Sequence, residues 1–227
     1  MRINKYLAGQ GYATRRGGDE LVRAGRVTIN GRRAQIGDQI NDGDQVVVKP
    51  TAHPVKYLYF AYHKPAGIIS HSPAEGETDI KTAVGRSDIF PVGRLDKNSR
   101  GLIVLTNDGR ITERLLHPRF EHEKEYAVVV ASDLAASFRR QMERGVIFDK
   151  QKTKPCRVQI TGERTFNIIL TEGRKNQIRR MVATLGNRVT DLKRVRIMNL
   201  KLDRLPAGTT RPITGPELTK FLKEIGL

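Results

Sequence analysis

The spacing of apolar and polar residues at the start of the chain predicts two short helices. Ile3, Tyr6 and Leu7 recur at helical spacing, and Gly11 suits the left-handed residue that commonly follows a last helical turn. A second helix is predicted over residues 14–24, with its apolar positions facing inward. The chain therefore opens on a helical pair.

Residues 27–48 change to the two-residue period of β-strands. Val27-Thr28-Ile29 alternates, Asn30-Gly31 is a residue pair of tight hairpin turns, and residues 45–48 form another apolar strand. Two helices followed by a small sheet predict a separate N-terminal domain, which we assign to residues 1–50. Because so short a segment buries only a thin core, we expect a binding partner to help stabilise it.

The remainder of the chain predicts a larger mixed domain. Prolines stiffen a linker assigned to residues 51–57, and the second domain is assigned to residues 58–227. Its strands are predicted at 58–62, 102–106, 125–130, 157–160, 166–170 and 199–202, and its helices at 133–144 and 176–185. Strands and helices do not alternate strictly, so the predicted class is α+β, with a central, mainly antiparallel β-sheet flanked by helices.

The amino-acid composition gives the chain a strong positive charge. Lys and Arg total 41 against 24 Asp and Glu, for a formal net charge of +17. This balance favours a nucleic-acid binder over a merely basic surface, because each Lys or Arg placed on a phosphate releases condensed counterions. Trp is absent and 6% of the residues are aromatic, so stacking along single strands is not the expected main binding mode.

Other features narrow the class of protein. The single cysteine, Cys156, excludes an internal disulfide and a cysteine-rich zinc site. No apolar run is long enough to cross a bilayer, and residues 1–6 have no signal core behind them. We expect a cytoplasmic protein that has no membrane partner and no metal or cofactor.

The most specific segment is the polar loop within residues 90–102. Asp96 lies in this loop among Arg94, Lys97 and Arg100. A carboxylate among cations stays ionised, which suits a catalytic group. A turn-forming aspartate that balances surface arginines is the alternative, because charge networks also perturb carboxylates.

Arg179 occupies an unusual place on the predicted helix 176–185. Ile178, Met181 and Val182 form part of an apolar stripe, and Arg179 borders it. An unpaired guanidinium at the edge of a core is costly, so Arg179 needs a carboxylate, either a local one or Asp96.

Tyr126 belongs to the predicted strand 125–130. Alternation places Tyr126, Val128 and Val130 on one face. By periodicity alone, Tyr126 is an ordinary half-buried strand residue.

Taken in order, these segments resemble the motifs of a known family. Gly93-Arg-Leu-Asp96 with Gly101-Leu102, then Lys124-Glu-Tyr126, then Gly173-Arg174 with Gln177-Ile-Arg179, are similar to three motifs of the RsuA/RluB/RluE/RluF ribosomal RNA pseudouridine synthases. Asp96-Lys97, residues 122–126 and residues 196–199 look closest to its RluF members. Residues 26–31 resemble part of the S4 RNA-binding domain, and Lys64-Pro65-x-Gly67 resembles a further family motif that is read as structural.

The resemblance implies roles for the matching residues. Asp96 would be the essential aspartate, Tyr126 the residue that packs on the target uracil, and Arg179 the partner of the aspartate. Two positions depart from many relatives, His63 where they have Asn and Asn176 where they have His, and this leaves the target base open. The basic residues that we expect to bind RNA are Arg15, Arg16, Arg26, Arg32, Arg33, Arg94, Arg174, Lys175, Arg180, Lys193 and Arg194.

The implied function is isomerisation of a specific uridine to pseudouridine, in 23S ribosomal RNA. The reaction breaks the N1–C1′ bond and joins C5 to C1′, with no redox step and no need of a metal or cofactor. The uracil must be flipped out of the helix. The carboxylate either attacks C1′ or removes the 2′ proton, and the sequence does not choose between these. The expected partner is ribosomal RNA or a ribosomal particle, with tRNA as a further candidate, and the expected state is a monomer.

Two other classes of protein fit the sequence less well than this function. A non-catalytic S4-type ribosome-binding or assembly factor is disfavoured because Asp96, Tyr126 and Arg179 are all retained. A glycosidase is disfavoured because the surroundings of Asp96 are cationic and no second carboxylate is marked near it.

Overall fold

The computed structural model describes residues 1–49 and 56–227. Its helices are α1 (Ile3–Gly9), α2 (Arg15–Arg23), α3 (Ile80–Val84), α4 (Arg110–Leu116), α5 (Phe138–Glu143), α6 (Gln177–Thr184) and α7 (Gly215–Glu224), with a 3₁₀ turn η1 (Pro118–Phe120). Its strands are β1 (Val27–Ile29), β2 (Arg32–Arg33), β3 (Val46–Val48), β4 (Tyr59–Lys64), β5 (Phe90–Val92), β6 (Arg100–Thr106), β7 (Lys124–Val130), β8 (Ile147–Phe148), β9 (Gln151–Lys152), β10 (Arg157–Gly162), β11 (Thr165–Leu170), β12 (Val189–Ile197), β13 (Leu200–Lys201) and β14 (Thr210–Pro212). Most of the linker predicted at 51–57 falls outside the described residues.

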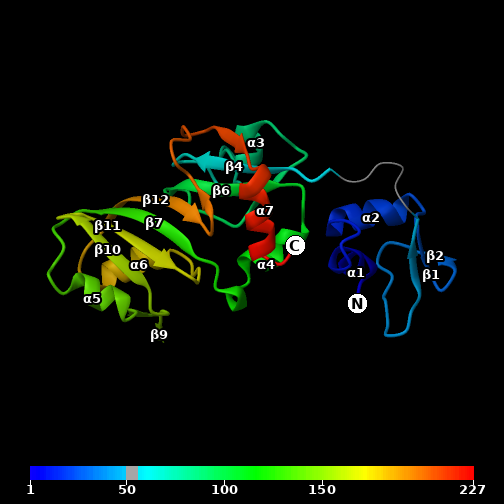
Figure 1. Cartoon of the computed structure of the whole chain (residues 1–227), viewed down its shortest axis with the longest axis horizontal. Helices are drawn as coiled ribbons and strands as arrows, with labels where there is room; N and C mark the ends of the chain where they lie inside the picture. The colour runs from blue at the N-terminus through cyan, green and yellow to red at the C-terminus, as the bar shows by residue number, and fades with distance from the viewer. Residues whose placement is uncertain (50–55) are drawn as a thin grey trace.

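The N-terminal unit lies at one end of the molecule, beside α4 (Figure 1). Its sheet has the order β2-β1-β3, with antiparallel pairing throughout. Ile3 and Leu7 of α1, Val22 of α2 and Val27 of β1 form part of its separate small core. The predicted pair of helices followed by a hairpin sheet is confirmed.

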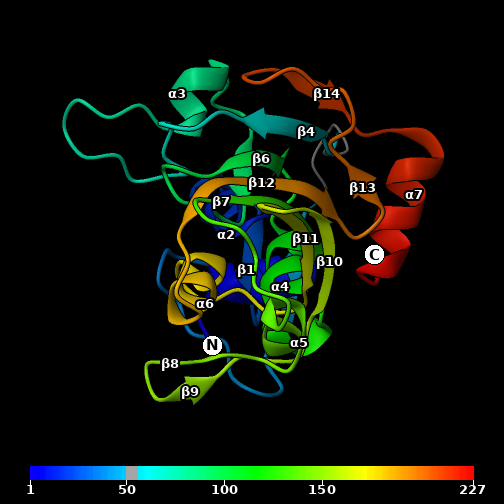
Figure 2. The same cartoon turned by 90° about the vertical axis from the view of Figure 1, so that its left-hand side faces the viewer.

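The larger unit is built on one sheet of nine strands. Seven of them follow the order β10-β11-β7-β12-β6-β4-β14 (Figure 2), and the other two pair at its side, β13 with β12 and β5 with β6. β12 runs parallel to β6, and the other pairings in this sheet are antiparallel. The predicted α+β class with a mainly antiparallel sheet is therefore confirmed.

Helices cover this sheet through separate apolar cores. Phe138 and Met142 of α5 pack with Met181 and Val182 of α6 against β7, β10, β11 and β12. A second cluster joins α4 and α7 to β4, β6 and β13. A third cluster places Ile80 of α3 with residues of β4 and β6. Every helix in residues 1–49 and 56–227 is too short or too polar to cross a membrane.

Gly101 shows how closely the central strands approach. Its φ is +115°, and an added Cβ would lie 2.3 Å from the backbone oxygen of Arg194 and 2.5 Å from its nitrogen. Only glycine fits this position, which lies where parallel β6 and β12 begin to pair. The loop that carries Asp96 leads into β6, and the close approach of Gly101 to Arg194 lies at that junction.

Asp108 anchors the start of α4 with a buried ionic network. Its side chain is fully buried and accepts hydrogen bonds from Tyr59 Oη at 2.5 Å and from Arg110 Nε and Nη2, both at 2.8 Å. The Arg110 guanidinium also lies 4.1 Å from the centre of the Tyr57 ring. Desolvation raises the pKa of Asp108, but the hydrogen bonds from Arg110 and Tyr59 outweigh it and hold the pKa below the usual 3.8.

We predict that Asp108→Ala lowers the free energy of unfolding by about 3 kcal/mol, near the lower end of the cost of breaking a buried ion pair. Because the folded-state pKa is depressed, the stabilisation from Asp108 is present above pH 3.8 and is lost as the pH falls through the folded value. Denaturant titrations at pH 7 and pH 3 measure both effects. Asp88→Ala is the control, since Asp88 pairs with Arg86 on the surface. An equal change in both variants would contradict the prediction.

Candidate active site

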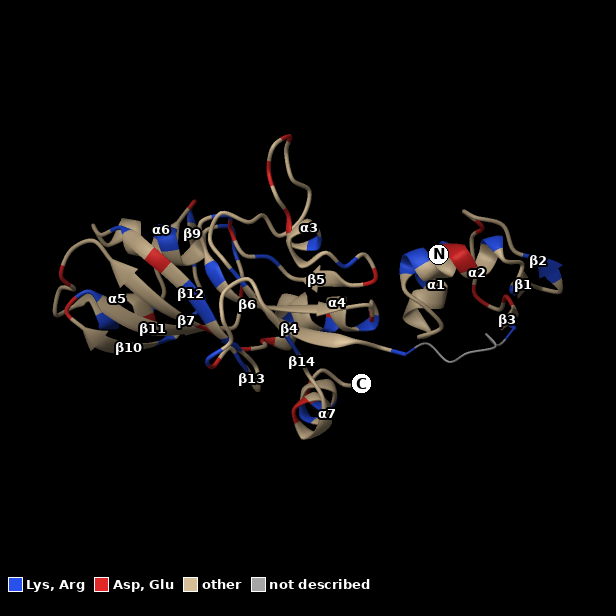
Figure 3. Ribbon diagram, turned by 90° about the horizontal axis from the view of Figure 1, so that it is seen from above, with Lys and Arg blue, Asp and Glu red and all other residues tan. Residues whose placement is uncertain are grey.

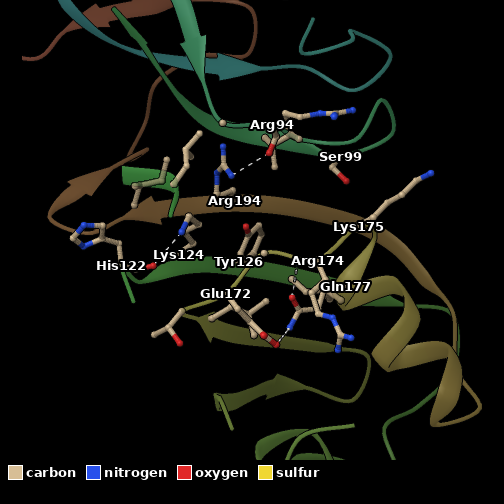
Figure 4. Close-up of a pocket in the computed structure, with 18 of the residues that line it drawn as sticks. Arg94, Ser99, His122, Lys124, Tyr126, Glu172, Arg174, Lys175, Gln177 and Arg194 are labelled. Atoms are coloured by element: carbon tan, nitrogen blue, oxygen red, sulfur yellow. Dashed lines mark hydrogen bonds between the residues drawn. The ribbon is translucent and has the colours of Figure 1, made fainter. Parts of the chain in front are cut away.

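Asp96 and Tyr126 line one cavity of about 520 Å³ in the larger unit, and Arg179 lines a second cavity that shares Asp96 with the first. Asp96 comes from the loop before β6, Tyr126 from β7, and Arg174 and Lys175 from the turn before α6. Figure 4 shows Tyr126 in the middle, with Arg94 and Ser99 on one side and Arg174 and Gln177 on the other. This volume is in the range of sites for small molecules and single nucleotides.

Two side chains, Ser70 and Lys64, fix the backbone of the Asp96 loop. Ser70 Oγ donates to Leu95 O at 2.8 Å and accepts from Leu95 N at 2.9 Å. Lys64 Nζ donates to Pro65 O and Ser99 O, both at 2.8 Å, and to Lys97 O at 3.3 Å. The backbone on each side of Asp96 is therefore pinned.

Lys64 holds the Asp96 loop through an ammonium group that is fully buried. The residue is fully buried, and desolvation lowers its pKa to about 8, although the charge of Asp96 acts in the opposite direction. Its three carbonyl acceptors replace the water lost on burial. The motif Lys64-Pro65-x-Gly67 thus ties β4 to the Asp96 loop, and Gly67 adds a hydrogen bond from its backbone nitrogen to Lys97 O at 2.8 Å.

Arg179 reaches the same loop, but differently from the prediction. Its guanidinium donates to Asn98 O at 3.0 Å, Ser99 Oγ at 3.3 Å and Val189 O at 3.3 Å. In residues 1–49 and 56–227 no ion pair includes Asp96, so the predicted Arg179–Asp96 pair is wrong for this structure. The physical reason is that Arg179, in the first turn of α6, faces the backbone of the loop beyond Asp96.

Asn176 occupies the position beside the carboxylate. With its amide nitrogen turned toward Asp96, it donates to Oδ2 at 2.8 Å and to Oδ1 at 3.2 Å. In the sequence Asn176 departs from many relatives, but no local pattern relates it to Asp96, which lies eighty residues earlier. Its residue type, a short amide at a helix start, was the only available signal.

The turn before α6 is closed by Gln177. This buried side chain donates to Glu172 Oε1 at 2.7 Å and accepts from Arg174 N at 2.9 Å (Figure 4). Arg174 and Arg180 lie over the Phe148 ring at 4.6 and 4.5 Å, and they also contact Gln151 and Asp149 respectively. The predicted RNA contacts Arg174 and Arg180 therefore lie side by side around one aromatic ring of the β8–β9 hairpin.

Arg194 lies in the cavity wall and is 4% exposed. Its Nε donates to Leu102 O at 2.7 Å and its Nη1 to Arg94 O at 3.4 Å (Figure 4). A guanidinium held in this way joins β12 to the chain before and after Asp96. Its position differs from the exposed one that we expected of an RNA contact, because β12 is a central strand that lies between β7 and β6.

The other predicted RNA contacts are more accessible. Arg94 and Lys175 are exposed at the cavity, and Lys193 is half-buried on β12. On the N-terminal unit, Arg15, Arg16, Arg32 and Arg33 are exposed, whereas Arg26 is half-buried. Basic residues mark both units in Figure 3, on α1 and β2 at one end and along β12 at the other. Among the described residues, no group of three or more His, Cys, Asp and Glu side chains could hold a metal ion.

Comparison with known proteins identifies the family to which this cavity belongs. The family described as RNA pseudouridylate synthase matches residues 58–184, and the S4 domain matches residues 1–46. The chain belongs to the RNA pseudouridylate synthase family. It is therefore an isomerase that acts on RNA, and the predicted RNA-binding S4 domain is confirmed.

Individual relatives support this assignment over the whole chain. The chain is 41% identical to the dual-specificity RNA pseudouridine synthase RluF of Salmonella typhi, covering 99% of this chain and 79% of that one. It is 33% identical to the ribosomal large subunit pseudouridine synthase B of Bacillus subtilis, covering 97% and 95% respectively. A crystal structure of a pseudouridylate synthase superimposes with a TM-score of 0.72 at 28% identity, covering 99% of both chains.

Proposed function

We propose that this pseudouridine synthase isomerises a specific uridine of 23S ribosomal RNA, with Asp96 as the catalytic carboxylate. The observation that carries the proposal is the cavity that Asp96 and Tyr126 share with Arg94, Arg174 and Lys175. A carboxylate, an aromatic ring and cations around one nucleotide-sized space are the groups that this reaction requires. The relatives named as RluF and as a large-subunit ribosomal enzyme support the choice of RNA.

The proposed chemistry begins with a flipped uridine whose base packs on Tyr126. The Asp96 carboxylate attacks C1′ or removes the 2′ proton, and the N1–C1′ bond breaks. The uracil turns and C5 bonds to C1′, as the Asp96–C1′ ester bond breaks or as Asp96 returns the proton to C2′. Loss of the C5 proton then completes pseudouridine, while N1 gains a proton. The pinned backbone around Asp96 supports this role, because a reacting group must be held in place for catalysis.

The accessible and half-buried basic residues then hold the RNA on both sides of the flipped base. Arg94, Lys175 and Arg174 would contact phosphates at the cavity, together with Arg180 and Lys193. Arg15, Arg16, Arg26, Arg32 and Arg33 would contact a neighbouring RNA segment from the S4 domain. We also propose that the enzyme acts as a monomer in the cytoplasm, and that a ribosomal particle or naked RNA serves as substrate.

Mapping of pseudouridines with and without the gene tests this proposal. A uridine in 23S RNA that is modified in the parent strain, unmodified in the deletion strain, and restored by the wild-type gene but not by Asp96→Asn is the expected result. The dual-specificity name of one relative makes tRNA a second RNA to map. Identical maps in the two strains would contradict the proposed substrate and favour an assembly factor without activity on these RNAs.

Tyr126→Phe separates stacking from proton transfer. Tyr126 is half-buried, and its hydroxyl has no hydrogen-bond partner in the described part of the chain. The Phe ring keeps the stacking contact, worth about 1–3 kcal/mol per base, so RNA affinity should be unchanged. If the hydroxyl takes the C5 proton, the variant still cleaves the glycosidic bond and forms the C5–C1′ bond, and it stops before the C5 proton is lost.

Gel analysis of a slowly released enzyme–RNA adduct, combined with assay of free product, measures this stall. Tyr126→Leu is the companion variant, because it removes the ring and should weaken RNA binding as well. Turnover of the Phe variant at the normal rate would assign the proton transfer to water and leave Tyr126 with a packing role.

A further inference from the structure

The Asp96 carboxylate is exposed at the cavity, and the backbone contacts of its loop do not reach its oxygens. The donor that reaches them is the Asn176 amide, at 2.8 Å from Oδ2 and 3.2 Å from Oδ1. The reverse amide orientation would set the Asn176 oxygen against the carboxylate oxygens, with no proton between them. Among the described residues, Asn176 thus makes the side-chain contact that fixes how the carboxylate is turned.

The backbone conformation of Asn176 holds its amide in this place. Its φ and ψ are 53° and 29°, the left-handed region that Asn tolerates better than most residues. Its backbone oxygen accepts from Arg180 N at 3.0 Å, and the next residue, Gln177, is buried and closes the turn. The turn that positions the amide is therefore itself held by hydrogen bonds on both sides of Asn176.

A helix cap is the ordinary role for an asparagine at this position. Asn176 directly precedes α6, yet its side chain makes no capping hydrogen bond to that helix. The amide is directed away from α6 and toward the Asp96 loop. The contact of its amide with the carboxylate therefore does not contribute to the stability of α6.

We propose that Asn176 is a positioning residue of the reaction, which orients the Asp96 carboxylate toward the sugar of the flipped uridine. The inference rests on the proposed role of Asp96. Hydrogen bonds to a charged acceptor are stronger than neutral ones, and two of them to one carboxylate fix its rotation as well as its place. A reacting group that is free to rotate spends less time in the productive geometry, so the chemical step slows.

The decisive variant is Asn176→Gly, because glycine keeps the left-handed backbone and removes only the amide. We expect the single-turnover rate constant at saturating RNA to fall by about 10- to 100-fold, the range for a lost hydrogen bond to a charged group. RNA affinity and the denaturation midpoint should stay at wild-type values. Asn176→His, which restores an N–H donor in a residue that also tolerates this conformation, should recover much of the rate.

Asn30→Gly is the matched control. Asn30 is also left-handed, with a φ of 50°, and its amide donates to Asp44 at 2.8 Å in the S4 domain, away from the cavity. Its single-turnover rate constant should equal that of the wild type.

A wild-type rate for Asn176→Gly, alongside an inactive Asp96→Asn, would overturn the inference and leave the proposed function intact. A rate loss matched by an equal loss of RNA affinity or stability would also overturn it. Activity in Asp96→Asn would remove the proposed function and the inference together.

Discussion

Asp96→Asn should reduce pseudouridine formation to background while RNA affinity stays within a few fold of the wild type. The change keeps the shape of the side chain and removes its charge, its nucleophilicity and its ability to take a proton. The loop should remain in place, because Ser70, Lys64 and Arg179 donate hydrogen bonds to its backbone oxygens. These contacts do not involve the Asp96 side chain. The measurement is product formation on RNA that contains the mapped uridine, together with a binding isotherm.

Asp133→Asn provides the control for the charge change. Asp133 is exposed and pairs with Arg164 at 2.6 Å, outside the residues that line the cavity, so this variant alters net charge equally. It should keep wild-type activity. Measurable turnover by Asp96→Asn, with deamidation excluded, would remove Asp96 from the mechanism.

Arg179→Leu should lower the rate of the chemical step by about 100-fold, the scale expected when a catalytic group moves by about 1 Å. The variant loses the hydrogen bonds to Asn98 O and Ser99 Oγ, and it leaves the fully buried Ser99 with one contact fewer. We expect a parallel loss of about 1–3 kcal/mol in the free energy of unfolding, the cost of unsatisfied buried polar groups. Single-turnover kinetics and denaturant titration measure the two effects.

Arg139→Leu is the control, since Arg139 on α5 is exposed and forms a surface i,i+4 ion pair with Glu143. It should change neither quantity appreciably. An Arg179→Leu variant with wild-type rate and stability would show that Arg179 does not hold the Asp96 loop.

The elements that the sequence predicted well are those whose apolar spacing is decided locally. The strand predicted at 166–170 is observed as β11 (Thr165–Leu170), and the helix predicted at 176–185 as α6 (Gln177–Thr184). The helix predicted at 133–144 is shorter, at Phe138–Glu143. Ends of elements depend on tertiary contacts, which local spacing does not record.

The largest omission was the central strand β12 (Val189–Ile197). Its charged residues conceal its period, because their partners come from other strands: Asp191 pairs with Arg100 of β6, and Arg196 with Glu125 of β7. The helices α3, α4 and α7 were also not predicted. Each is short or rich in charged residues, and α4 and α7 are stabilised by a core shared with distant strands.

At the site, the resemblance to a family predicted roles for both Asp96 and Tyr126, and the two residues line one cavity. Tyr126 is also the half-buried strand residue that periodicity predicted. The contacts around Asp96 were not predictable. Lys64, Asn176 and Arg179 meet the loop across gaps of many residues, and which of them faces the carboxylate depends on how α6 begins. Only the folded geometry distinguishes the Arg179 contact to the loop backbone from the predicted ion pair.

The most direct test of the account is release of tritium from ribosomal RNA labelled at C5 of uridine, because the proton at that carbon must leave when pseudouridine forms. The wild-type protein should release tritium approaching one equivalent per 23S RNA, and Asp96→Asn should release none at equal RNA occupancy. Folded, RNA-bound wild-type protein that releases no tritium from 23S transcripts or from ribosomal particles would contradict the account. Equal release by the two proteins would contradict the role of Asp96.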